Sequence, residues 1–396
     1  MSLPFAARLQ NVETSAIREL FKLLGKPGII SFAGGFPDPA LFDAVGIREA
    51  SQLALSDATA GPVLQYGATE GWNPLREALS AHMAKKGITA TPTEIITTTG
   101  SQQALDLIGK TMIDPGDKVI VEGPTFLATI QCFRLYGADI VSAPIDADGV
   151  KVDELEKLIV EHKPKFIYLV PTFGNPSGAM LSLARRKRVL ELAAQHKVLV
   201  VEDDPYGELY FGEAPPPPSM LALSSEVPGS REWIAYCGSF SKVLSPGLRV
   251  GWMIAQPQLL ANAVMCKQFS DAHTSNLTQA IAAHYLGLNR MDAALAVVRK
   301  TYAERAHTMA DCLRQDLGDA ITFSQPQGGM FFWTRLTAPG ADAAEFAKRA
   351  IEKLVAFVPG APFYATNPDR ATLRLSFATA DVGKIVEGVG RLGQAL

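Results

Sequence analysis

Tyr236-Cys237-Gly238-Ser239-Phe240-Ser241-Lys242 is the stretch that decides the interpretation of this chain, and Arg249 follows it seven residues later. The mostly apolar run from Trp233 to Cys237 predicts a buried strand. This strand ends in a turn of small residues that presents two hydroxyl groups and an amine, with a guanidinium group further along. A surface lysine beside a serine turn is the alternative interpretation.

These groups suit a phosphate monoester that also carries an aldehyde. A lysine amine can form a Schiff base with the aldehyde, while hydroxyl groups and an arginine can bind the phosphate. Pyridoxal 5′-phosphate (PLP) has both features. The stretch therefore predicts a site for this cofactor around Lys242.

Length and composition favour a two-domain enzyme. The chain has 396 residues, of which 47% are apolar and 19% charged, and its net charge is −3, as expected of a well-filled core. We expect no nucleic-acid partner, because the sequence has no basic stripe. We also expect no membrane span, because no apolar run approaches the roughly 18 residues that one requires.

Cysteine and histidine spacing argue against a metal site. The four cysteines form no C-x-x-C pair, and the six histidines show no H-E-x-x-H spacing. The N-terminus lacks the basic and apolar regions of a signal peptide. We therefore expect reduced thiols and a cytoplasmic protein.

Short apolar runs alternate with amphipathic helical patterns between residues 95 and 290. This alternation predicts α/β organisation with a largely parallel sheet, in which ligands bind at the carboxyl ends of the strands. The predicted strands are Glu94–Thr99, Lys118–Val121, Phe166–Val170, Val198–Glu202, Ile234–Cys237 and Gly251–Ala255, and the predicted helices include Gln102–Met112 and Ser182–His196.

Two polar motifs follow other predicted strands. Ser101 and Gln102 open a helix whose free N–H groups can bind an anion, with Ser101 as the N-cap. Asn175 precedes a proline, and its amide could donate to a phenolate oxygen. A plain helix cap and a plain turn are the alternatives.

Charged residues within apolar strand patterns need partners. Asp203, in Glu202-Asp203-Asp204-Pro205-Tyr206, could face a protonated pyridine nitrogen. For Glu202 and Asp204 taken singly, we expect a solvated loop start. Arg374, in the apolar pattern 372–377, could bind a substrate carboxylate bidentately or form a structural salt bridge.

Taken in order, these motifs resemble the fold-type I PLP-dependent aminotransferases of class I/II, and most closely the subgroup of kynurenine/2-aminoadipate and LysN-like multisubstrate aminotransferases. The resemblance covers nearly the whole chain and is much less specific for the substrate than for the family. Its motifs are Ser31-Phe32-Ala33-Gly34-Gly35-Phe36-Pro37, Gln65-Tyr66-Gly67, Gly100-Ser101-Gln102-Gln103, Asn175-Pro176-Ser177-Gly178, Asp203-Asp204-Pro205-Tyr206, Gly238-Ser239-Phe240-Ser241-Lys242, Gln327-Gly328-Gly329-Met330-Phe331, Val358-Pro359-Gly360 and Leu373-Arg374-Leu375-Ser376-Phe377.

The resemblance implies a three-layer α/β/α large domain with a mainly parallel seven-stranded sheet, and a smaller α+β domain. We expect residues 1–50 to form an N-terminal segment that packs with the small domain and the dimer partner. Residues 51–290 are then the large PLP-binding domain, and residues 291–396 the small domain.

The resemblance also implies roles for individual residues. The catalytic residues would be Lys242, which carries the Schiff base, Asp203, which pairs with the pyridine nitrogen, and Tyr206. The other implied cofactor contacts are Asn175 with Tyr206 on the ring hydroxyl, Phe126 stacked on the ring, and Ser101, Gln102, Ser239, Ser241, Arg249 and the partner subunit's Tyr66 on the phosphate. The implied substrate-binding residues are Arg374, Gly35, Asn175 and Arg18.

The implied reaction is ping-pong transfer of the amino group of an L-amino acid to a 2-oxo acid such as 2-oxoglutarate, with broad aromatic, aliphatic and 2-aminoadipate-like specificity. Arg18, on the predicted helix Thr14–Leu24, is expected to meet a distal carboxylate of the substrate; an exposed arginine paired with Glu19 or solvent is the alternative. Competing functions are a PLP-dependent lyase or decarboxylase on the same fold and a non-catalytic aminotransferase-like sensor.

Overall fold

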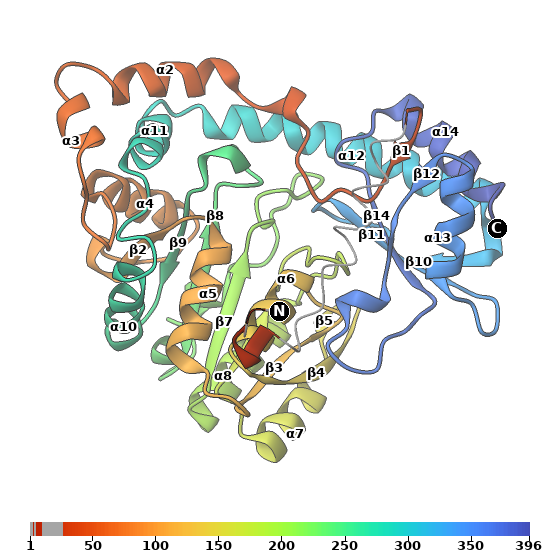
Figure 1. Cartoon of the computed structure of the whole chain (residues 1–396), viewed down its shortest axis with the longest axis horizontal. Coiled ribbons are helices and arrows are strands. Elements are labelled where there is room, and N and C mark those ends of the chain that lie inside the picture. The colour runs from red at the N-terminus through yellow and green to blue at the C-terminus, as the bar shows by residue number, and fades with distance from the viewer. Residues whose placement is uncertain (1–2, 4, 10–26) are drawn as a thin grey trace.

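The structure is a computed structural model that describes residues 3, 5–9 and 27–396 (Figure 1). In this part of the chain, the largest sheet has the strand order β2-β9-β8-β7-β6-β3-β4-β5. In that order the strands are Ile95–Thr98, Gly251–Ile254, Ile234–Ser239, Leu199–Asp204, Phe166–Leu169, Lys118–Gly123, Asp139–Asp146 and Gly149–Val150. The five strands from β8 to β4 run parallel, whereas β9 runs antiparallel to β8 and β2. The predicted mainly parallel sheet of seven strands is confirmed, and the two-residue β5 is added to it as an antiparallel edge strand.

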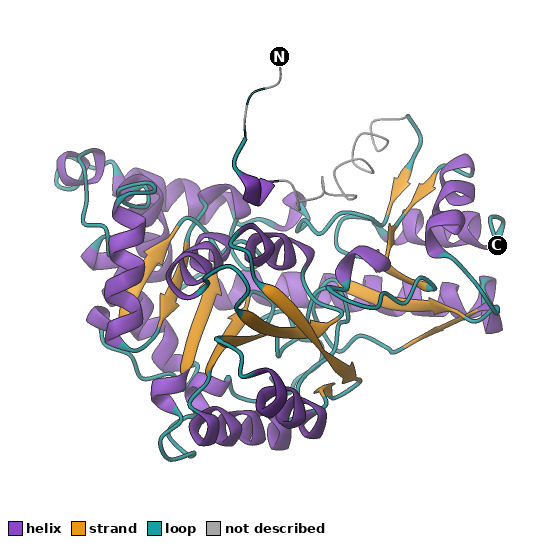
Figure 2. Cartoon of the chain, turned by 60° about the horizontal axis from the view of Figure 1, so that its bottom comes forward, coloured by secondary structure: helices purple, strands orange, loops and turns teal. Residues whose placement is uncertain are grey.

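Helices cover both faces of this sheet (Figure 2), which explains why its strands are nearly continuous in apolar residues. One face carries α5 (Ser101–Met112), α6 (Leu127–Leu135) and α10 (Pro257–Gln268), and the other carries α7 (Val152–His162), α8 (Leu183–His196) and α9 (Met220–Leu223). Further helices of the large part are α2 (Ala44–Ala54), α3 (Ala60–Leu64), α4 (Asn73–Lys85) and α11 (Asn276–Gly287).

The C-terminal part contains a second sheet, in the order β10-β11-β14-β13, with antiparallel neighbours. These strands are Ile321–Phe323, Phe331–Leu336, Thr372–Ser376 and Val358–Pro359, and the accompanying helices are α12 (Met291–Asp316), α13 (Ala343–Glu352) and α14 (Val382–Gly393). β1 (Ile30–Ser31) pairs with β12 (Val355–Ala356), so residues near the N-terminus join the C-terminal part.

Some expectations stay untested. The division at residues 50 and 290 remains a prediction, and the predicted helix Thr14–Leu24 with Arg18 lies outside the described residues. Across residues 3, 5–9 and 27–396, the structure contains no helix whose length and apolar character would let it cross a membrane.

Strand direction brings the polar motifs together. Residues that follow β2, β6, β7 and β8 lie at the same edge of the sheet as residues that precede the antiparallel β9. This edge therefore receives Ser101, Asn175, Asp203, Ser239 and Arg249.

Glu202 corrects one expectation, because it is fully buried and does not form a solvated loop start. Its carboxylate accepts hydrogen bonds from the N–H groups of Met220 at 2.8 Å and Leu221 at 2.9 Å, at the start of α9. The buried guanidinium of Arg186 lies 4.0 Å away. Burial raises the pKa of Glu202 to about 7, so these partners are what make its charge tolerable.

We predict that Glu202→Ala lowers the free energy of unfolding by about 3–5 kcal/mol, because Arg186 then stays buried without a carboxylate. Urea denaturation measures the difference. The control is Glu226→Ala, which breaks the exposed pair of Glu226 and Lys187 and should change stability by about 0–1 kcal/mol. Equal effects of the two substitutions would contradict the prediction.

Candidate active site

Lys242 lies in the turn that follows β8, and its Nζ donates to the carbonyl oxygen of Gly35 at 2.9 Å. Burial, together with the positive charges of Arg374 and Arg249, lowers the pKa of Lys242 from 10.5 to about 8. A lysine whose amine is partly neutral near pH 7 can act as a nucleophile and as a base. Lys242, from which the sequence analysis started, therefore has a pKa that suits Schiff-base formation and proton transfer.

Asp203 is the last residue but one of β7 and is only 3% exposed. Its Oδ2 accepts a hydrogen bond from the Tyr168 hydroxyl at 2.7 Å. Its Oδ1 is buried and has no hydrogen-bond partner among the described residues. Burial raises the pKa of Asp203 to about 7. A buried carboxylate oxygen without a partner is a suitable place for a cationic N–H donor.

Arg374 is a buried cation at the centre of β14. Its Nη1 donates to Asn175 Oδ1 and its Nη2 to the Ala33 carbonyl oxygen, both at 2.7 Å, whereas its Nε lacks a partner in the part of the chain that the structure describes. Its guanidinium carbon lies 4.3 Å from the ring centroid of Phe331 and 5.0 Å from that of Phe363. Burial lowers the pKa of Arg374 to about 10. Within residues 27–396 it forms no ion pair, so the alternative of a structural salt bridge is not observed there, and a bound anion would stabilise the charge.

Asn175 and Tyr206 lie beside Arg374. The Tyr206 hydroxyl forms a hydrogen bond with Asn175, and burial raises the pKa of Tyr206 well above 10, so the hydroxyl stays protonated. The Tyr206 ring meets the Phe331 ring edge-on, with centroids 6.0 Å apart. These contacts join Arg374 and Phe331 of the small sheet to Asn175 and Tyr206, which follow strands of the large sheet.

A group of donors lies where α5 begins. The Ser239 hydroxyl donates to Ser241 Oγ at 3.0 Å and accepts from the Ser241 N–H at 3.1 Å. The N-cap of α5 is Gly100, with φ +81°, and not Ser101 as predicted. This positive φ favours glycine, and a Cβ atom on Gly100 would also lie 2.5 Å from Arg249 Nη2, which would have to shift. Hydroxyls, helix N–H groups and a guanidinium therefore converge as donors for a phosphate.

Gln102, Phe126 and Tyr66, the remaining predicted cofactor contacts, are less buried than Asp203 and Arg374. Gln102 is exposed at the second position of α5, and Phe126 is half-buried directly before α6. Tyr66 is 85% exposed, and its ring meets that of His273 edge-on at 5.9 Å.

Asp204 supports the turn that carries Tyr206. Its carboxylate accepts hydrogen bonds from the Tyr236 hydroxyl at 2.9 Å and the Gly207 N–H at 3.0 Å, and Lys86 Nζ lies 3.3 Å away. Asp204 is thus another exception to the predicted solvated loop start. The sequence analysis did not identify Lys86 or Tyr236, because neither lies near residue 204 in the sequence.

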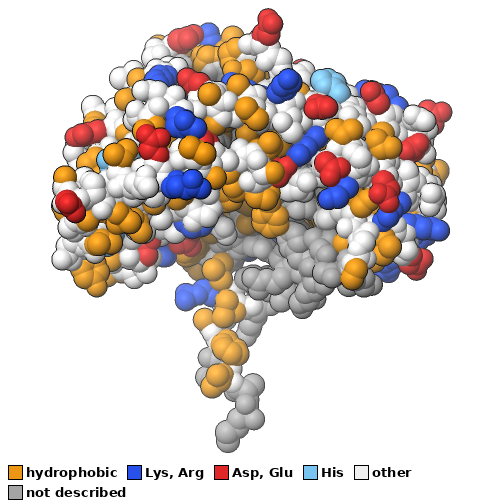
Figure 3. Space-filling model, turned by 90° about the horizontal axis from the view of Figure 1, so that it is seen from above, with side chains coloured by type: hydrophobic (Ala, Val, Ile, Leu, Met, Phe, Trp, Pro, Cys, Tyr) orange, Lys and Arg blue, Asp and Glu red, His pale blue; other side chains and the backbone are white. Residues whose placement is uncertain are grey.

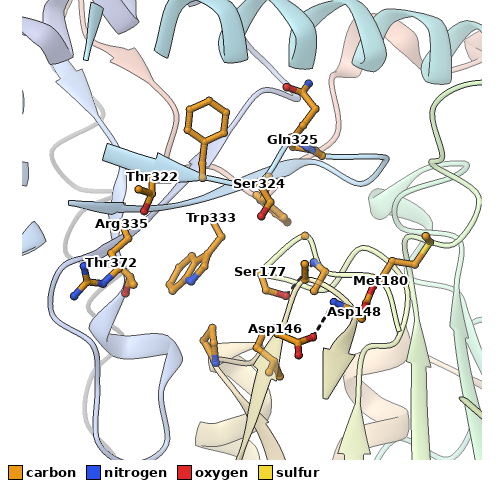
Figure 4. Close-up of a pocket in the computed structure, with 18 of the residues that line it drawn as sticks. Asp146, Asp148, Ser177, Met180, Thr322, Ser324, Gln325, Trp333, Arg335 and Thr372 are labelled. Carbon is orange, nitrogen blue, oxygen red and sulfur yellow. Dashed lines mark hydrogen bonds between the residues drawn. The ribbon is translucent and has the colours of Figure 1, made fainter. Parts of the chain in front are cut away.

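A cleft of about 520 Å³ opens beside the site, between the two parts of the chain (Figure 4). Figure 4 shows Trp333 and Arg335 on the side of the small sheet, opposite Asp146 and Asp148 from the large one. Phe331, which contacts Arg374, also lines this cleft. The site therefore lies next to the junction of the two parts.

The comparison with known proteins now decides the family, since residues 37–392 match the family described as aminotransferase class I and II. The chain belongs to this family. It is 44% identical, over 388 residues, to a 2-aminoadipate transaminase of Thermus thermophilus, a match that covers 97% of this chain and 94% of the relative. It is 38% identical, over 398 residues, to aromatic-amino-acid aminotransferase 1 of Thermococcus litoralis, covering 99% and 94% of the two chains.

A solved structure agrees with these matches. The crystal structure of the α-aminoadipate aminotransferase LysN of Thermus thermophilus, complexed with N-(5′-phosphopyridoxyl)-L-leucine, has a TM-score of 0.90 and 42% identity, covering 99% of this chain and 97% of that chain. The predictions of family, fold type, enzyme class and cofactor are confirmed. This protein is a PLP-dependent aminotransferase of fold type I.

The groups of this aminotransferase fit PLP. The free buried oxygen of Asp203 suits a protonated ring nitrogen, and the amine of Lys242 with its lowered pKa suits an aldehyde. The donors at the start of α5 suit a phosphate.

We predict that Arg374→Met raises the pKa of Lys242 in the cofactor-free aminotransferase. Removing a neighbouring positive charge stabilises the protonated amine. The pH dependence of Lys242 acetylation, followed by peptide mass spectrometry, should have its midpoint near pH 8 in the unsubstituted protein and at higher pH in the variant. Arg335→Met, which removes an exposed arginine paired with Asp369, should leave the midpoint unchanged. An unchanged midpoint in Arg374→Met would show that Arg374 does not contribute to the lowered pKa of Lys242.

Proposed function

We propose that this aminotransferase transfers the amino group of aromatic, aliphatic and 2-aminoadipate-like L-amino acids to a 2-oxo acid such as 2-oxoglutarate, in a ping-pong reaction. The observation that carries the proposal is the placement of Lys242 beside Arg374, a buried cation with no ion-pair partner among residues 27–396. The names of the two relatives, a 2-aminoadipate transaminase and an aromatic-amino-acid aminotransferase, support this range of donors.

We assign the cofactor contacts as follows. Asp203 would pair with the ring nitrogen, Asn175 and Tyr206 would bind the ring hydroxyl, and Phe126 would stack on the ring. The phosphate would be held by Ser101, Gln102, Ser239, Ser241, Arg249 and the partner subunit's Tyr66. When bound, PLP supplies an aldehyde for the amino group and an electron-withdrawing ring that eases loss of the substrate Cα proton.

Lys242 is the general base in this proposal. With a pKa of about 8, about a tenth of its amine is neutral at pH 7 and can take a proton from the substrate Cα. The hydrogen bond from Lys242 Nζ to the Gly35 carbonyl oxygen holds the amine in place.

Arg374 orients the substrate. Its guanidinium would bind the α-carboxylate, with Asn175 and the Gly35 N–H assisting, and so direct the Cα–H bond toward Lys242. Hydrogen bonds to Asn175 and Ala33 already fix the guanidinium, so little conformational freedom is lost when a substrate binds.

Apolar rings beside Arg374 support bulky side chains in the substrate. Phe331 and Phe363 flank the guanidinium at 4.3 and 5.0 Å. We propose Arg18 as the group that accepts acidic side chains; it lies outside the described residues, and the proposal rests on the sequence.

Exposed apolar side chains support a homodimer with shared active sites. Tyr66, Phe269 and Leu64 are 85%, 84% and 69% exposed. Orange apolar side chains are exposed on the described part of the surface in Figure 3, and Leu3 and Phe5 of the described N-terminal residues are exposed as well. We take these exposed apolar side chains as support for an interface in the proposed dimer. We also propose a cytoplasmic location.

We predict that purified protein reconstituted with PLP converts leucine, phenylalanine and 2-aminoadipate to their 2-oxo acids, with glutamate formed from 2-oxoglutarate. Lys242→Ala should bind PLP but lose all detectable transfer, because it lacks the base. Lys110→Ala, at an exposed pair with Asp106, should retain normal rates. Release of ammonia or carbon dioxide without glutamate would instead support a lyase or a decarboxylase.

We predict a particle of about twice the chain mass of 42.5 kDa by analytical ultracentrifugation.

Tyr66→Phe should weaken PLP binding about tenfold, because the partner subunit's hydroxyl no longer reaches the charged phosphate. Tyr210→Phe serves as the control, because Tyr210 has no part in the proposed site. Its ring centroid lies 3.9 Å from the guanidinium carbon of Arg299, and the substitution keeps this ring. A monomer with full activity would refute the shared site.

A further inference from the structure

Tyr168 is a fully buried residue of β6 that the function described above does not use. In the sheet it pairs with Val201, which lies two residues before Asp203, so Tyr168 and Asp203 project from the same face. The ring of Phe133, on α6, packs edge-on against Tyr168 with centroids 5.9 Å apart. The direction of the phenol is therefore set by packing.

The hydroxyl of Tyr168 makes the two oxygens of Asp203 different. It donates to Oδ2 at 2.7 Å and is, within the described chain, the one hydrogen-bond donor to this carboxylate. Burial and the charge of Asp203 raise the pKa of Tyr168 well above 10, so the hydroxyl keeps its proton. Oδ2 is thereby occupied and Oδ1 stays free.

Apart from Tyr168, the surroundings of Asp203 disfavour the ionised form of its carboxyl group. Burial and the carboxylate of Asp204 raise the pKa of Asp203, whereas the bond from Tyr168 lowers it. Glu122 is a second buried carboxyl whose charge acts on Tyr168, and it accepts a hydrogen bond from the Val170 N–H at 2.9 Å. The Tyr168 hydroxyl thus offsets part of the cost of burying an ionised Asp203.

We propose that Tyr168 is a positioning residue for the cofactor ring, which holds the Asp203 carboxylate so that Oδ1 remains free to bind the ring nitrogen. The inference rests on the function proposed above, in which Asp203 pairs with that nitrogen. Tyr168 touches neither substrate nor cofactor in this role; it acts through Asp203.

The test measures dissociation constants on the cofactor-free protein, with PLP and with an analogue whose ring nitrogen is replaced by carbon. Tyr168→Phe keeps the packing against Phe133 and removes the hydroxyl. It should bind PLP about tenfold more weakly, the effect of one hydrogen bond to a charged group, and should bind the carbon analogue as tightly as the unsubstituted protein does.

The chain offers a matched control in Tyr136. Its hydroxyl donates to Asp106 Oδ1, also at 2.7 Å, at the C-terminal end of α6. Tyr136→Phe removes the same kind of phenol–carboxylate bond away from the site, and it should change neither dissociation constant. Equal weakening of both ligands by Tyr168→Phe would overturn the inference in favour of a packing role, as would no weakening at all.

A second pair of variants covers the case in which Tyr168→Phe does not fold. In an Asp203→Asn background no buried carboxylate loses its donor, so adding Tyr168→Phe should leave the dissociation constant for PLP unchanged. A further tenfold loss there would overturn the inference. If the unsubstituted protein binds the two ligands equally, the proposed pairing of Asp203 with the ring nitrogen fails instead, which is a separate result.

Discussion

Incomplete solvation of three charged groups, Lys242, Arg374 and Asp203, is the constraint on which the site depends. Each is held where water is excluded and where the protein supplies fewer partners than its charge requires. Burial therefore lowers the pKa of the lysine and raises that of the aspartate. In the proposed function, this unmet demand would be met by a cofactor with an aldehyde and a basic ring nitrogen, and by a substrate with a carboxylate.

The sheet and the small domain supply these groups from different directions. Asp203 ends a parallel strand and Lys242 follows the next one, so both reach the carboxyl edge. Arg374 enters from the antiparallel sheet of the C-terminal part, where its strand pairs with the strand of Phe331. The substrate would thus bridge the two parts of the chain, beside the cleft that separates them.

Two nearby carboxylates to which we assign no part in the chemistry are paired. Glu202 is neutralised by Arg186 and two N–H groups, and Asp204 by Lys86 and a tyrosine hydroxyl. These pairs stabilise the strand end on both sides of Asp203. Asp203 differs from its two neighbours in having one satisfied oxygen and one free oxygen, and this free oxygen is the one that we propose binds the ring nitrogen.

The sequence by itself determined the family, the central strands and the residues around Lys242, because each depends on local order: apolar runs, turn residues and motifs in a fixed succession. It did not predict β4, since this strand has exposed positions that interrupt the apolar run. It also missed Tyr168 and Lys86, and it placed the N-cap at Ser101, whereas the N-cap is Gly100, whose positive φ favours glycine. Only the tertiary structure decided these points, because burial and hydrogen-bond partners come from residues far apart in the chain. Tyr168 and Asp203 are 35 positions apart, and Lys86 and Asp204 are 118 apart.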